Sequence, residues 1–188
     1  AALAEGISYI REHRRVIQLI AVAMVIWLTG AVVRSTIPAL VRDVYEQNEY
    51  FQMTLFQARL GIGMLIGALI LTALGDALRS EIAITWSLAG IAFSFGLLTL
   101  SVFLPVSPGT AHHLGGPAVI LAGVFGAGVM ASYHALLQRT IPNRLRGRIF
   151  GISDLCTMAG LLLATGILGI PTWKNIDRAT GWILLGTT

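Results

Sequence analysis

Residues 16–41 read VIQLIAVAMVIWLTGAVVRSTIPALV, an almost unbroken run of apolar side chains. An α-helix rises about 1.5 Å per residue, so a run of this length crosses a bilayer core of roughly 30 Å with some tilt. The charged residues are bunched outside such runs and do not recur with a helical or strand period. This stretch therefore predicts a transmembrane helix.

Similar apolar runs follow it along the whole chain, and only short polar loops separate them. They leave no room for a second, water-soluble domain. The predicted fold class is an all-α membrane protein, a polytopic transmembrane helical bundle with about five complete spans and the start of a sixth. The expected spans are residues 16–41, 51–75, 82–104, 117–141, 149–170 and, in part, 181–188.

Composition agrees with a bilayer environment, because 55% of the residues are apolar, 12% are charged and the mean hydropathy is +0.78. The 13 Lys and Arg residues lie in short loops and form no basic face, so we expect no nucleic-acid partner. A single cysteine, Cys156, excludes an internal disulfide framework. The chain contains no GxSxG, HExxH or Walker motif, so we expect neither an enzyme nor a cofactor.

The first fifteen residues have a different pattern. Leu3, Ile7 and Ile10 recur at helical spacing among charged residues, which predicts an amphipathic helix on the cytoplasmic membrane surface. A disordered linker is the alternative. The chain begins without Met and stops inside an apolar run, so we expect it to be part of a longer protein.

Arginine is distributed unequally between the two sets of loops. By the positive-inside rule, the richer set, which includes the chain start and residues 143–148, faces the cytoplasm. Its members are Arg11, Arg14, Arg15, Arg79, Arg144, Arg146 and Arg148.

Two segments have motifs that resemble a known family. The first span ends with Pro38, Arg42 and Asp43, and residues 135–152 read ALLQRTIPNRLRGRIFGI. At this separation they resemble the C-terminal half of major facilitator superfamily permeases, in particular the bacterial exporters related to the enterobactin and macrolide efflux proteins. The resemblance covers nearly the whole chain.

The resemblance implies a secondary active transporter that works by alternating access, with this chain supplying helices seven to twelve in truncated form. It further implies export of a small molecule, proton coupling, a bacterial cytoplasmic (inner) membrane, surrounding membrane lipids and an N-terminal six-helix half of the same protein as partner. One loop departs from the family pattern, because Gly75 and Asp76 are followed by Ala77 and Leu78 and not by a base cluster. That departure keeps open an alternative, a non-transporting membrane scaffold or transporter-like subunit.

Charged residues of the cytoplasmic loops are candidates for a gate, whose ion pairs would break in each transport cycle. A purely topological role is the alternative. The gate candidates are Asp76, Arg79, Arg144, Arg146 and Arg148.

Polar residues inside the spans are the candidates for function, because ionisable groups at membrane depth are costly unless they face a cavity or a partner. Arg34, Gln57 and Arg59 are expected to line the substrate pathway and to favour anionic substrates; snorkelling of the arginines to the surface is the alternative. His134 and Asp154 are expected at similar depth and are candidates for a proton relay, with a static hydrogen bond as the alternative.

Overall fold

The computed structural model describes residues 2–46, 50–74, 80–104 and 107–168. Within these ranges the chain is helical and contains no strand, so the predicted all-α fold class is confirmed. The helices are α1 (Ala2–Glu12), α2 (Arg14–Ala39), the π-helical turn η1 (Leu40–Val44), α3 (Tyr50–Leu74), α4 (Ser80–Phe103), α5 (Pro108–Thr140) and α6 (Asn143–Leu168).

Four helices in the described ranges are long and apolar enough to cross a membrane. They overlap the first four expected spans. The helix α6 overlaps the fifth expected span. The partial span expected at 181–188 lies outside the described residues. The four segments are Arg14–Arg42, Tyr50–Leu74, Glu81–Phe103 and Pro108–Thr140.

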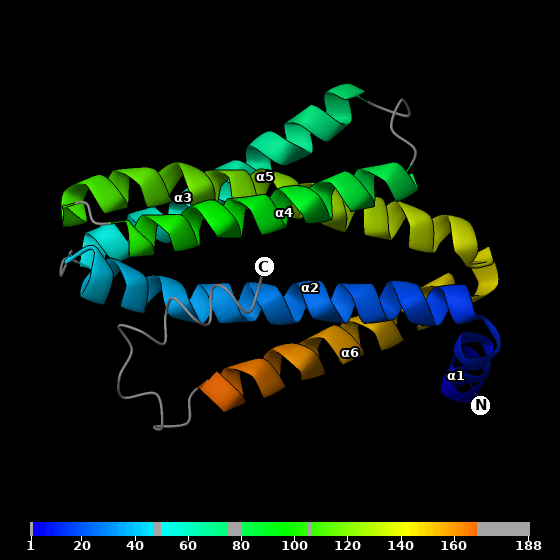
Figure 1. Ribbon diagram of the computed structural model, residues 1–188. Helices are drawn as coiled ribbons and strands as arrows, with labels where there is room; N and C mark the ends of the chain where they lie inside the picture. The colour runs from blue at the N-terminus through cyan, green and yellow to red at the C-terminus, as the bar shows by residue number, and fades with distance from the viewer. Residues whose placement is uncertain (1, 47–49, 75–79, 105–106, 169–188) are drawn as a thin grey trace.

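The helices pack in two groups (Figure 1). α5 lies against both α3 and α4, and α2 lies against α6. The short α1 sits at the end of the bundle where α5 turns into α6. Each end of the bundle has its own apolar core. One includes Ile37, Leu40, Phe56, Leu98 and Val119, and the other includes Val16, Ile20, Leu137, Leu145 and Ile149.

Glycines bring α3 and α5 into backbone contact. A Cβ atom added to Gly63 would overlap the carbonyl oxygen of Ile120, and one added to Gly67 would overlap that of Val124. Gly123 of α5 faces Gly63 in the same way. Small residues let helix backbones approach this closely in membranes. This side of α3 therefore packs tightly against α5.

The start of α5 differs from the sequence prediction. Residues 105–116 were expected to form a loop, but α5 begins at Pro108. The Ser107 hydroxyl caps the helix by accepting from the backbone N–H of Thr110 at 3.4 Å, and proline is well tolerated at the first helical position. The loop prediction is therefore wrong for residues 108–116.

The end of α2 also differs, because a hydrophilic turn was expected at Arg42, Asp43, Glu46 and Glu49, the last of which lies outside the described residues. The helix instead continues past Pro38 into the π-helical turn η1. A proline removes a backbone donor from the hydrogen-bond ladder, and π-helical turns occur where such a ladder shifts. The segment ends at Glu46, whose φ of 55° is left-handed.

Candidate functional site

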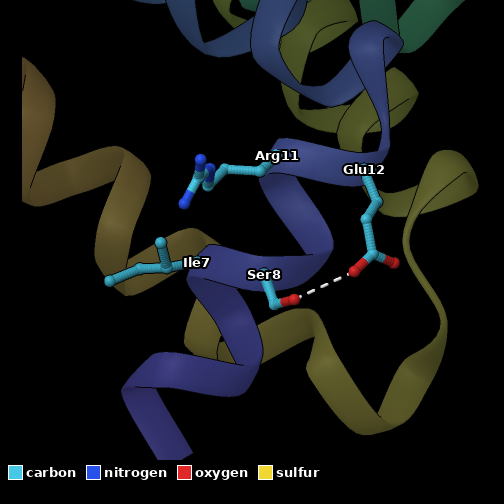
Figure 2. A pocket seen from close by; sticks show the side chains of 4 residues that line it. All are labelled: Ile7, Ser8, Arg11 and Glu12. Atoms are coloured by element: carbon cyan, nitrogen blue, oxygen red, sulfur yellow. Dashed lines mark hydrogen bonds between the residues drawn. The ribbon is translucent and has the colours of Figure 1, made fainter.

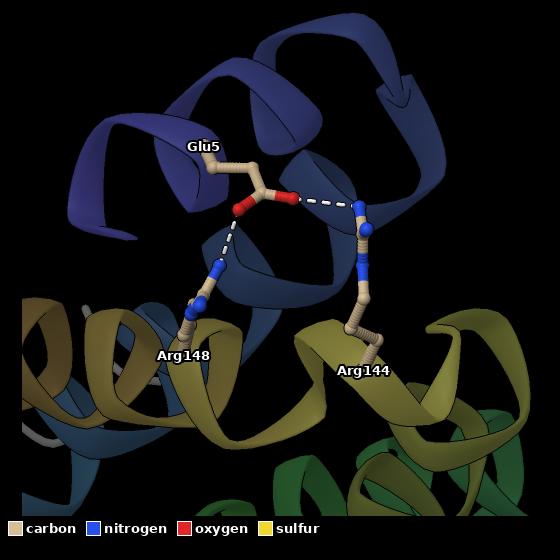
Figure 3. A network of polar contacts seen from close by, with 3 residues as sticks. All are labelled: Glu5, Arg144 and Arg148. Atoms are coloured by element: carbon tan, nitrogen blue, oxygen red, sulfur yellow. Dashed lines mark hydrogen bonds and ion pairs between the residues drawn. The ribbon is translucent and has the colours of Figure 1, made fainter. Parts of the chain in front are cut away.

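The arginines of the α5–α6 turn meet α1 through one carboxylate. Glu5 accepts from Arg144 Nη2 at 2.7 Å through one oxygen and from Arg148 Nη1 through the other (Figure 3). Gly6 is buried beside them, and a Cβ there would lie 3.0 Å from Ile152 Cδ1. The ion pairs and this close approach hold α1 against the start of α6.

The third arginine of the turn has another partner. Arg146 Nη2 donates to the backbone carbonyl of Gln138 at 2.8 Å, near the C-terminal end of α5. Carbonyls there lack helical donors and carry partial negative charge, so a guanidinium group stabilises them. Two other gate candidates, Asp76 and Arg79, lie outside the described residues.

A hollow of about 540 Å³ lies on the surface of α1 (Figure 2). Its lining side chains, Ile7, Ser8, Arg11 and Glu12, all belong to this one helix. Ser8 donates to Glu12 at 2.9 Å along the helix. Since a ligand site needs convergent groups from opposing walls, this hollow is an open surface and not a binding cavity.

The three substrate-pathway candidates occupy different environments. Arg34 on α2 and Gln57 on α3 have exposed side chains. Arg59 on α3 is half-buried, and its guanidinium carbon lies 5.4 Å from the centre of the Phe56 ring. Among the described residues, its buried Nη1 atom has no hydrogen-bond partner. Arg59 points from α3 toward α5, because a Cβ atom added to Gly116 would lie 2.5 Å from its Nη1 atom.

Arg59 belongs to a cluster of aromatic rings at this end of the bundle. The centre of the Phe56 ring lies 5.7 Å from that of Tyr45 and 5.6 Å from that of His112. Tyr45 is fully buried, and its hydroxyl shares a 2.6 Å hydrogen bond with Ser101. Burial raises the pKa of Tyr45 to about 12, although the hydrogen bond with Ser101 opposes this effect. Tyr45 is therefore neutral at physiological pH.

His112 is the member of this cluster that was not predicted from the sequence, since it was assigned to an external loop. It lies on α5 with 9% of its surface exposed, and its Nε2 atom has no hydrogen-bond partner among the described residues. Ser107 followed by Pro108 could have revealed the start of this helix, because that pair is typical of a capped helix N-terminus.

The two relay candidates lie in consecutive helices, His134 in α5 and Asp154 in α6. The His134 ring stacks on Phe150 of α6 with centroids 5.7 Å apart, and Tyr133 shares a 2.5 Å hydrogen bond with Ser153. The Asp154 side chain is exposed. In the described part of the chain, no hydrogen bond or ion pair joins it to His134, so the relay stays a prediction.

Comparison with known proteins identifies the family of the chain. A sequence model described as Major Facilitator Superfamily matches residues 1–165. No curated protein matches the chain, and no solved structure does. The match covers α1 to α5 and nearly all of α6, which contain Arg59 and the ion pairs of Glu5 with Arg144 and Arg148. The chain therefore belongs to the major facilitator superfamily, a superfamily of membrane transporters.

Proposed function

We propose that this integral membrane protein is a secondary active transporter that exports a small molecule by alternating access, with protons as the coupling ion. The observation that carries the proposal is the half-buried Arg59, whose buried Nη1 atom lies between α3 and α5. A permanent charge at membrane depth is costly unless it serves a cavity or a partner. Arginine also binds carboxylates through paired hydrogen bonds.

The proposed pathway includes Arg34, Gln57 and Arg59 and favours anionic substrates. In the full-length protein, reconstituted in proteoliposomes with an imposed pH gradient, we expect Arg59→Gln to reduce efflux of carboxylate-bearing compounds by roughly tenfold or more, as for a lost charged hydrogen bond. Efflux of neutral compounds should change far less. An equal effect on both classes would make Arg59 structural.

A cytoplasmic gate is the second part of the proposal. The gate would consist of ion pairs between the other half of the transporter and the candidates Asp76, Arg79, Arg144, Arg146 and Arg148. Alternating access requires the halves of such a transporter to rock, and ion pairs at the closed end must then separate. The exposure of Arg144 and Arg148 supports this role, because solvent lowers the cost of breaking an ion pair to about 1 kcal/mol or less.

The proposed coupling runs through His134 and Asp154. The two residues lie on consecutive helices, so a movement of α5 against α6 would bring the carboxylate and the imidazole together to pass a proton. Asp154→Asn should therefore flatten the pH profile of efflux. An unchanged profile would remove both residues from the coupling mechanism.

The finer assignments are also proposals. The export direction, the bacterial inner membrane and the N-terminal six-helix half all follow from the exporter-like motifs at 38–43 and 142–148. The departure after Asp76 supports a second candidate, a transporter-like subunit without transport activity. Absence of efflux from proteoliposomes that contain correctly folded full-length protein would favour that candidate.

A further inference from the structure

Two unpartnered polar atoms lie in one small region between α3 and α5. Arg59 Nη1 and His112 Nε2 are both buried and lack hydrogen-bond partners within the described ranges. Both side chains contact the same Phe56 ring, at 5.4 Å and 5.6 Å from its centre. Leaving a buried donor unsatisfied destabilises the fold, and more so when the group is charged. Two such donors at one place suit a group that accepts a hydrogen bond from each.

The face that α5 presents here is shaped around these groups. His112, Gly115 and Gly116 follow helical spacing and share one side of α5. A Cβ atom on Gly116 would lie 2.5 Å from Arg59 Nη1, and one on Gly115 would overlap the Tyr45 hydroxyl. The missing side chains therefore provide the space that the guanidinium and the phenol occupy.

The charges of the region select an anion. Arg59 is permanently positive, and in the described part of the chain no carboxylate pairs with it. A neutral histidine with its proton on Nε2 adds a second donor. A carboxylate has two acceptor oxygens, so one can accept from Arg59 and the other from His112. A hydrogen bond between a carboxylate and a guanidinium group is also stronger than one between neutral groups.

We propose that Arg59 and His112 together bind a carboxylate group, with one oxygen accepting from Arg59 Nη1 and the other from His112 Nε2. The inference rests on the proposed transport function, since it assigns a substrate class and a second binding residue to the same pathway. His112 becomes a specificity-determining residue, and the Phe56 ring shields the bound group from water.

The probe for this site is acetate, with acetamide as its neutral counterpart of the same shape. We expect acetate, at constant ionic strength, to raise the melting temperature of the purified full-length protein, whereas acetamide does not. His112→Phe keeps a ring but has no donor, so it should weaken the acetate response by roughly tenfold. His112→Gln retains an N–H group and should keep most of the response.

A matched glycine pair on α5 controls for folding. Gly116→Ala should weaken acetate binding by displacing Arg59, whereas Gly126→Ala, which has nothing within 4 Å of its added Cβ, should leave it unchanged. No acetate response in the wild type, or an equal response in wild type and His112→Phe, overturns the proposed site. Efflux is measured on the same preparations. Efflux without an acetate response refutes this site alone, and an acetate response without efflux refutes the transport function alone.

Discussion

Individual glycines of α3 have different roles although they are close in sequence. Gly63 is buried against the α5 backbone, whereas Gly61 is exposed, and a Cβ atom added to it would have nothing within 4 Å. The sequence predicted the close-packing side, since Gly63 and Gly67 lie four residues apart. The partner helix depends on the tertiary fold, because Gly123 is distant in the chain.

The two glycines give a matched test of helix packing. Gly63→Ala should lower the free energy of unfolding by about 1–3 kcal/mol, because its Cβ meets backbone atoms that cannot rotate away. Gly61→Ala should leave stability unchanged or raise it by up to about 1 kcal/mol, because alanine favours the helix. Reversible unfolding of the full-length protein in detergent measures both. Equal losses would contradict the packing of α3 on α5.

The candidate site was only partly predictable at the level of single residues. Arg59 could be placed because it shares a helix side with Gly63 and Gly67. His112 could not, because the Pro, Gly, Ser and His residues around it suggested a loop, and the cap that turns this segment into helix is a local contact of Ser107. Glu5 was missed because its arginine partners lie 139 and 143 residues away.

Among the helices, α5 is longer than a membrane crossing requires. Its 33 residues extend for about 50 Å, well beyond a hydrocarbon core of roughly 30 Å. Its ends must therefore emerge on opposite sides of the membrane. The arginines near its C-terminal end predict that this end is cytoplasmic.

Cysteine labelling tests the orientation of α5. With Cys156 replaced by alanine, a membrane-impermeant thiol reagent should reach Gly109→Cys only from outside and Asn143→Cys only from the cytoplasm. Both positions are exposed, so the substitutions remove no packing contact. Labelling of both from the same side would contradict the topology.

The docking of α1 on α6 depends on the two ion pairs of Glu5 at the surface, so a single substitution can test it. Glu5→Gln weakens both ion pairs, each worth about 1 kcal/mol or less at an exposed site, so amide hydrogen exchange in α1 should accelerate by on the order of threefold to tenfold. Glu12→Gln is the control, since the hydrogen bond that the described residues give Glu12 is to Ser8 of the same helix. If α1 exchange is equally fast in both variants, the ion pairs do not hold α1 in place.

For the whole molecule, hydropathy was enough to predict an all-α membrane bundle, because every spanning segment must satisfy its own backbone hydrogen bonds. The grouping of α3, α4 and α5 apart from α2 and α6 was not predictable, since most apolar faces are equally suited to lipid and to another helix. Exposed side chains such as Leu65 and Leu162 fit a lipid environment.

Thiol accessibility at Gln57 tests whether the protein works by alternating access. The measurement uses the full-length protein with Cys156 replaced by alanine, and it compares labelling of Gln57→Cys from the two sides of sealed vesicles. If Gln57 lines a pathway that opens alternately, an impermeant reagent should reach the cysteine from both sides, while Gly109→Cys and Asn143→Cys are each reached from one. Labelling of Gln57→Cys from one side only, or from neither, would contradict a pathway at Gln57 that opens alternately to the two sides.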